Sequence, residues 1–192
     1  DEVITGFRLA LGGAQAYYGV KADLVTFGKI IGGGMPVGAY CGSRALMEQV
    51  APCGPVYQAG TLSGNPVAMA AGLAQLTYLR DHQEIYPELN RKAVWLAGEL
   101  RRSAEKHGVS VAVNQVESVL SPFFVPTEVT RFTDAKGSDL QRYAQYFAGM
   151  LRRGVALAPA QFEAMFLSAA HTEAELEETA QAADQALAEL VS

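Results

Sequence analysis

The stretch Thr26-Phe-Gly-Lys-Ile-Ile-Gly-Gly-Gly-Met-Pro-Val-Gly38 sets a single lysine, Lys29, among apolar residues and glycines. The apolar run at residues 24–27 predicts a short buried strand that ends at Gly28, and residues 37–40 predict a second strand. Consecutive glycines between the two runs predict a tight loop. We expect such surroundings to remove water from the Lys29 ammonium, which favours the neutral amine as a nucleophile toward an aldehyde. The alternative is a lysine that extends from the strand end into solvent.

Two further motifs are candidates for chemistry. Asp1 leads directly into the apolar residues Val3 and Ile4, and an aspartate paired with a pyridine nitrogen keeps that ring protonated. Its alternative interpretation is a frayed chain end. The run Gly60-Thr-Leu-Ser-Gly-Asn-Pro66 places hydroxyls and small residues just before a predicted helix, an arrangement that suits a phosphate. Its alternative interpretation is an ordinary capped loop.

Composition restricts the class of protein. The chain has 192 residues, of which 49% are hydrophobic and 18% charged, with a formal net charge of −5 and no cluster of Lys or Arg. These values predict an ordered globular protein, with neither nucleic acid nor a membrane as a partner. Cys41 and Cys53 lack zinc-ligand spacing, which favours a reducing, cytoplasmic location and no metal site. The chain opens on Asp1 without a methionine, so we expect a longer parent polypeptide.

Periodic apolar residues predict several long helices and a second domain. An Asn-Pro start signal precedes a helix over 66–80, expected to be buried because it lies in the most apolar part of the chain. A second helix is expected over 85–107. The elements expected after it are strands at 109–113, 119–125, 155–158 and 166–169, and helices at 138–154 and 172–190 that each open with a capping-box sequence. This order predicts a small α+β domain.

The motifs together resemble the pyridoxal 5′-phosphate (PLP) core of class III aminotransferases. They are Asp1-Glu-Val-Ile-Thr-Gly-Phe-Arg8, the lysine stretch, and Tyr57-Gln-Ala-Gly-Thr-Leu-Ser-Gly-Asn-Pro66. Leu157-Ala-Pro-Ala-Gln-Phe-Glu163 and Ala169-Ala-His-Thr172 extend the resemblance over essentially the whole chain. The family implies an α/β, fold-type-I PLP-dependent transferase. Residues 1–80 would be the C-terminal portion of its large mixed-sheet domain, and 81–192 the connecting helix and a small C-terminal α+β domain.

The resemblance implies a role for each residue that matches a family motif. Lys29 would be the catalytic lysine that attaches the PLP, Asp1 would bind the pyridine nitrogen, and Val3 would pack against the ring. Gly60 and Thr61 would bind the cofactor phosphate of the neighbouring subunit. The family therefore implies a homodimer with shared active sites.

Other residues have looser roles by the same resemblance. Tyr57 and Gln58 would lie near the shared interface, and Glu163 would lie near the active site, where an acid could help its gating. We interpret His171 as structural. Glu117 departs from the family pattern, which implies a small residue at that position. The family also carries part of its site before the aspartate motif, so the site residues of this chain alone would be incomplete.

The resemblance implies PLP-dependent amino transfer within a single five-carbon substrate, an isomerase reaction of tetrapyrrole synthesis in which the cofactor passes through its pyridoxamine phosphate form. The alternative is a class III ω-aminotransferase with a 2-oxoacid acceptor. Such enzymes hold an arginine for the α-carboxylate near the C-terminus, whereas residues 154–192 contain no Lys or Arg. That difference favours internal transfer. A third hypothesis is a non-catalytic chain that keeps the fold as an interaction module.

Overall fold

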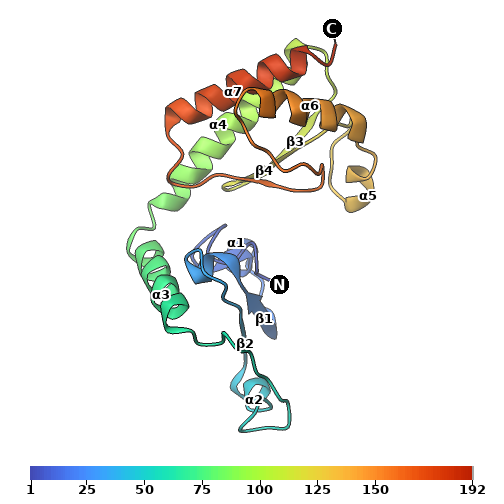
Figure 1. Cartoon of the computed structure of the whole chain (residues 1–192). Coiled ribbons are helices and arrows are strands. Elements are labelled where there is room, and N and C mark those ends of the chain that lie inside the picture. The colour runs from blue at the N-terminus through green and yellow to red at the C-terminus, as the bar shows by residue number, and fades with distance from the viewer. Residues whose placement is uncertain (192) are drawn as a thin grey trace. The chain divides into compact units, whose positions relative to one another are not determined.

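In a computed structural model that describes residues 1–191, the chain separates into two units, Asp1–Tyr86 and Pro87–Ser192 (Figure 1). The separation falls within the first turn of helix α4 (Ile85–Lys106). The sequence-based proposal instead places the domain boundary after residue 80, at the end of the preceding helix.

A two-stranded antiparallel ribbon forms the frame of the first unit. Strand β1 (Leu24–Phe27) has the predicted bounds, but its exposed and half-buried residues alternate rather than being buried throughout. Strand β2 (Ala39–Gly42) begins two residues later than predicted. The pairing sets Phe27 opposite Ala39, so the residues before Ala39 serve to reverse the chain. The short elements of this unit are helix α1 (Gly13–Tyr18), the 3-10 helix η1 (Lys29–Gly32) and helix α2 (Arg44–Met47).

Helix α3 (Pro66–Asp81) confirms the Asn-Pro start signal. The Asn65 side-chain oxygen accepts hydrogen bonds from the backbone N–H groups of Val67 at 3.0 Å and Ala68 at 3.2 Å, as an N-cap does. The expectation of a buried helix is wrong for the described residues. Leu73 is 69% exposed, because only one face of the helix is covered within this part of the chain.

A three-stranded antiparallel sheet, three long helices and one short helix form the second unit (Figure 1). Its strands β3 (Ala112–Val116), β4 (Val119–Phe123) and β5 (Met165–Phe166) lie in the order β3-β4-β5. Helices α4, α6 (Leu140–Arg152) and α7 (Glu173–Ala188) share one core with the sheet. The largest fully buried apolar side chains of that core are Leu96, Leu120, Tyr146 and Met150. The short helix α5 (Phe132–Ala135) follows β4.

Several strand predictions in the second unit are wrong. The predicted strands at 109–113 and 119–125 are β3, shifted three residues later, and β4, which ends at Phe123. No strand forms at 155–158, where Val155 and Leu157 pack against the core instead of pairing. The predicted strand at 166–169 is the two-residue β5, because β4 pairs only with Met165 and Phe166 there.

The helix starts of the second unit agree with the sequence only in part. Thr172 forms the predicted capping box with Glu175 at the start of α7. Helix α6 is capped by Asp139 rather than Ser138, and Asp139 accepts from the backbone N–H groups of Gln141 and Arg142, both at 3.0 Å. Along the described chain, no helix combines the length and apolar character that crossing a membrane requires.

Candidate active site

The first three residues of the chain lie beside the end of β1. The backbone N–H of Glu2 donates to the carbonyl oxygen of Thr26 at 2.8 Å, and Glu2 forms a parallel bridge with Phe27. The Asp1 oxygen Oδ1 accepts from the backbone N–H of Val3 at 2.7 Å and from the Thr26 hydroxyl at 3.4 Å. The Asp1 carboxylate is therefore held at the same strand end that leads into Lys29.

Val3 packs against the residue just before the lysine. A Cβ atom placed on Gly28 would lie 3.2 Å from Cγ1 of Val3, closer than ordinary van der Waals contact. Glycine at this position lets the Val3 side chain reach the backbone that carries Lys29. The fold thus places Asp1 and Val3 against Thr26 and Gly28, which lie just before Lys29, and the family resemblance predicts that all three belong to one site.

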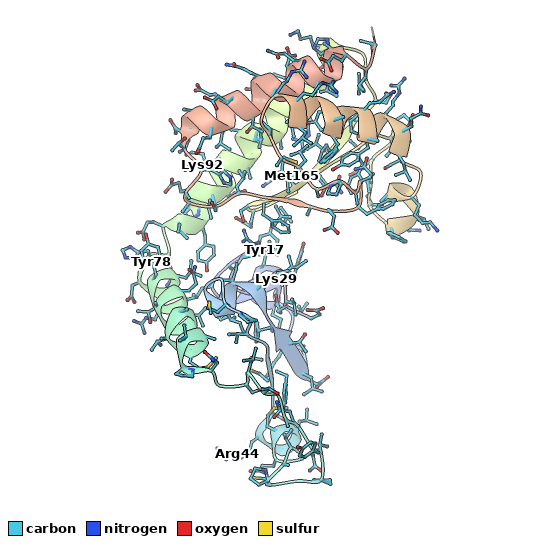
Figure 2. All side chains as sticks on the ribbon, in the orientation of Figure 1. Tyr17, Lys29, Arg44, Tyr78, Lys92 and Met165 are labelled. Atoms are coloured by element: carbon cyan, nitrogen blue, oxygen red, sulfur yellow. The ribbon has the colours of Figure 1, made fainter. Side chains whose placement is uncertain are left out.

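Lys29 is the first residue of η1 and has a positive backbone angle, φ +49°. A non-glycine residue in this region is held against a conformational cost, and such positions cluster at functional sites. Its side chain is exposed within the described residues (Figure 2). We expected the surroundings of Lys29 to remove water from its ammonium group. The described residues do not do this, because the strand and the glycine loop leave the Lys29 side chain exposed.

The position of η1 is fixed by backbone contact with α3. A Cβ atom on Gly72 would lie 2.2 Å from the carbonyl oxygen of Ile31, and one on Gly33 would lie 2.6 Å from that of Ala71. Gly33 also has a positive φ of +56°, which favours glycine. These glycines let the two backbones touch, so the turn that carries Lys29 has a firm support. Sequence analysis missed Gly72, although a glycine inside a helix pattern is a signal of close approach.

The residues expected to bind phosphate form a separate group. Gly60 and Thr61 lie in an exposed loop before α3, where the Ser63 backbone N–H donates to the Gly60 carbonyl at 3.0 Å. Tyr57, at the start of this loop, is 83% exposed, and Gln58 is also exposed. Among the described contacts, none joins this loop to Asp1 or Lys29.

Glu163 belongs to the second unit and is exposed. Burial raises the pKa of the nearby Tyr143 hydroxyl, and the Glu163 carboxylate adds to that rise. Next to it in the loop, buried Gln161 donates to the Pro122 carbonyl at 2.7 Å and accepts from the Phe124 N–H at 3.3 Å. Gln161 ties the Glu163 loop to β4. Sequence reasoning missed this role, since a buried glutamine carries no periodic signal.

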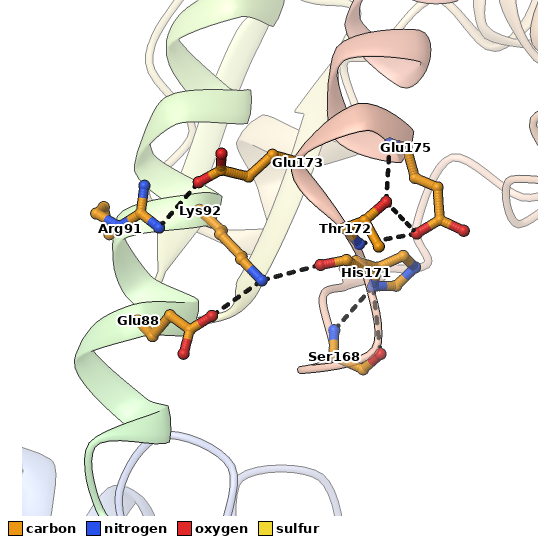
Figure 3. Close-up of polar contacts among 8 residues, drawn as sticks. All are labelled: Glu88, Arg91, Lys92, Ser168, His171, Thr172, Glu173 and Glu175. Atoms are coloured by element: carbon orange, nitrogen blue, oxygen red, sulfur yellow. Dashed lines mark hydrogen bonds and ion pairs between the residues drawn. The ribbon is translucent and has the colours of Figure 1, made fainter.

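A polar cluster joins α4 to the start of α7 (Figure 3). Lys92 is 7% exposed, and its Nζ donates to the His171 carbonyl at 2.9 Å and lies 3.0 Å from Oε1 of Glu88. The His171 ring nitrogen Nδ1 accepts from the Ser168 backbone N–H at 3.0 Å. The two described partners of His171, Lys92 and Ser168, both belong to the second unit. These contacts suit the structural role that we predict for His171.

Comparison with known proteins identifies relatives of this arrangement. The family model described as aminotransferase class III matches residues 1–186. A glutamate-1-semialdehyde 2,1-aminomutase from Ruminiclostridium cellulolyticum is 57% identical over 192 residues, and one from Persephonella marina is 55% identical over 191 residues. Both alignments cover 100% of this chain but only 44% of the relative. The chain therefore spans less than half the length of these curated relatives.

Solved structures share the fold. An ω-transaminase from Sphaerobacter thermophilus aligns with a TM-score of 0.85 at 30% identity, over 97% of this chain and 43% of that one. A glutamate-1-semialdehyde aminomutase from Pseudomonas aeruginosa aligns with a TM-score of 0.85 at 22% identity, over 99% of this chain and 44% of that one. The second likeness shows the fold alone. Together they confirm the expected α/β architecture of fold-type-I PLP-dependent transferases.

Proposed function

Because the chain belongs to the class III aminotransferase family, we propose that it supplies the lysine-bearing part of a glutamate-1-semialdehyde 2,1-aminomutase. This enzyme would be an isomerase that converts glutamate-1-semialdehyde to 5-aminolevulinate for tetrapyrrole synthesis. The observation that carries the proposal is the 57% identity over the full chain to a relative of that name. The ω-transaminase, which represents the competing reaction, is 30% identical.

The residues beside β1 fit PLP, the cofactor that the family implies. Asp1 offers a carboxylate for the pyridine nitrogen, and both of its described hydrogen bonds use Oδ1. Lys29 offers an exposed primary amine for the cofactor aldehyde. The Val3 side chain packs against Gly28, the residue before Lys29, and would offer an apolar support for a ring. When bound, PLP would supply an electron sink for charge that develops on the substrate carbon.

Each residue would then have a defined task. The Asp1 carboxylate would keep the pyridine nitrogen protonated, because a negative charge beside that nitrogen favours its charged form. The Lys29 Nζ would first hold the cofactor and then carry a proton between carbon atoms, since the amine is released once the substrate replaces it. One lysine can therefore perform both functions.

The proposal extends to the assembly and the rest of the chain. Gly60 and Thr61 would bind the cofactor phosphate of the partner subunit in a homodimer, with Tyr57 and Gln58 near that interface; the exposure of this loop supports a shared site. Glu163 would act in gating. Residues 1–80 would belong to the cofactor-binding domain and 81–192 to the connecting helix and small domain of a cytoplasmic enzyme.

The reaction can be tested with the full-length enzyme loaded with pyridoxamine phosphate. We expect conversion of glutamate-1-semialdehyde to 5-aminolevulinate over many turnovers without an added amino donor, because the amino group that the cofactor donates to the substrate would be replaced by the substrate's other amino group in each turnover. Lys29→Ala should abolish turnover, whereas Lys21→Ala, a matched change at another exposed lysine, should not. Turnover that stops after one equivalent and resumes on addition of an amino acid would favour the ω-aminotransferase. Failure to bind PLP would favour the non-catalytic alternative.

A further inference from the structure

Glu2 is a buried acid for which the proposed function has no task. Glu2 is 3% exposed and directly follows Asp1 in the chain. Oε2 accepts a hydrogen bond from the Thr5 hydroxyl and one from the Ala14 backbone N–H at 3.0 Å, and Oε1 accepts from the Gln15 N–H at 2.8 Å. Burial of a carboxylate is costly unless its oxygens are paired in this way.

The first turn of α1 is shaped to receive this carboxylate. Ala14 and Gln15 are the second and third residues of α1, whose N–H groups have no partner within a helix. Gly13 has φ +67°, and a Cβ atom there would lie 2.7 Å from Oε2 of Glu2. Burial alone would raise the pKa of Glu2, but the hydrogen bonds from Thr5, Ala14 and Gln15 outweigh it and lower the pKa. These hydrogen bonds therefore stabilise the charged carboxylate form of Glu2.

The backbone of Glu2 is bound as firmly as its side chain. Its N–H donates to the Thr26 carbonyl at 2.8 Å, and its carbonyl accepts from the Gly6 N–H at 2.9 Å. The segment that carries Asp1 and Val3 is thus attached to β1 on one side and to α1 on the other. A shift of Glu2 would move both neighbours, because each is joined to it by one peptide bond.

We infer that Glu2 is a positioning residue, which holds the Asp1 carboxylate at the end of β1 by anchoring the chain to the first turn of α1. The inference rests on the proposed role of Asp1 at the cofactor ring. It gives α1 a part in the site through an intrachain contact, although α1 supplies none of the proposed cofactor ligands.

The test uses the full-length enzyme and measures PLP itself. Glu2→Gln replaces one acceptor oxygen with an NH₂ group that faces a backbone N–H. We expect the PLP dissociation constant to rise about tenfold, the change that corresponds to loss of one hydrogen bond to a charged group. The pH midpoint of the bound cofactor's visible absorbance should shift in the same direction as in Asp1→Asn. A merely structural role would leave that midpoint unchanged in Glu2→Gln.

A double-mutant cycle separates positioning from general loss of stability. If Glu2 acts through Asp1, the double variant Asp1→Asn/Glu2→Gln should bind PLP about as weakly as Asp1→Asn alone. Independent effects would instead multiply, and that result would overturn the inference. Glu48→Gln is the matched control, because Glu48 is exposed and lies 3.8 Å from its partner Arg44; it should leave both readouts unchanged.

A milder variant covers the case in which Glu2→Gln does not fold. Thr5→Val removes only the hydroxyl that donates to Glu2, and it should shift the absorbance midpoint in the same direction by a smaller amount. A folded Thr5→Val enzyme with the parent midpoint and PLP affinity would overturn the inference. If Asp1→Asn itself leaves the midpoint unchanged, the proposed role of Asp1 fails. If Asp1→Asn shifts it while the Glu2 and Thr5 variants do not, only the positioning inference fails.

Discussion

Gly72→Ala tests whether contact between α3 and η1 fixes the position of Lys29. In the middle of a helix, replacing glycine by alanine is intrinsically favourable by about 1 kcal/mol. At this site, however, the new Cβ would lie 2.2 Å from the Ile31 carbonyl oxygen. The Ile31 oxygen is a backbone atom and the new Cβ would be bonded directly to the α3 backbone, so α3 and η1 must separate by about 1 Å to restore ordinary contact.

The cost can be isolated by comparison with Gly98→Ala. Gly98 also lies inside a helix, α4, but a Cβ atom there meets nothing within 4 Å. Gly98→Ala should therefore stabilise the protein by about 1 kcal/mol. Because helix propensity contributes equally to both variants, the difference between them reports the cost of overpacking, which we expect to be about 1–3 kcal/mol. Gly72→Ala should be neutral or destabilising overall.

The functional consequence should be larger than the loss of stability. Lys29 lies two residues before Ile31, and a displacement of about 1 Å at a reacting group can cost about a hundredfold in rate. We would compare urea midpoints and kcat of the full-length enzyme carrying each substitution. If Gly72→Ala is stabilised as much as Gly98→Ala and keeps the parent kcat, the contact between α3 and η1 does not position Lys29 and the reasoning is refuted.

Two further changes test the second unit. Glu117 has φ +47° in the two-residue turn between β3 and β4, and a residue with a Cβ is strained in this left-handed region. Glu117→Gly should therefore stabilise the second unit by about 1 kcal/mol. An unchanged urea midpoint would contradict this prediction. Hydrogen bonds from Lys106 and His107 lower the pKa of Asp184 in the folded protein. The charged Asp184 should therefore stabilise the protein above the unfolded-state pKa of about 4, and this stabilisation should be lost as the pH falls through the lower folded-state pKa. The stability difference between the parent and Asp184→Asn should therefore narrow in acid; a constant difference would argue against the assignment.

Local signals in the sequence predict the starts of α3 and α7 better than they predict the strands, although the start of α6 is one residue off. Asn65 and Thr172 cap α3 and α7 as expected, because each acts on N–H groups two or three residues away. The apolar residues at 155–158 predict a strand, but such a run is equally compatible with an irregular segment that packs against a core. Strand bounds depend on the pairing partner, and that information is not local. The two-residue β5 is the clearest example.

The family motifs predict that Asp1, Val3 and Lys29 share one site, and the structure places Asp1 and Val3 beside the end of β1 that leads into Lys29. The supporting contacts were not predictable in the same way. Glu2 joins α1 across 12 and 13 residues, and Gly72 meets Ile31 across two different elements. Such pairs depend on how the elements pack, whereas a motif records only the residues in one short segment.

The two units of the described chain are stabilised by different means, and this bears on how the site is built. The buried apolar side chains of the first unit are only Leu9, Ile31, Ala68 and Leu79, while the core of the second unit draws on helices and sheet alike. Around Lys29, order comes instead from backbone contact at Gly72 and from the buried anion Glu2. Contacts of this kind fix positions without removing much water, because they bury little apolar surface. The first unit can therefore set the geometry of Asp1 and Lys29 by itself, whereas we expect the desolvation of the Lys29 amine to require further polypeptide or bound cofactor.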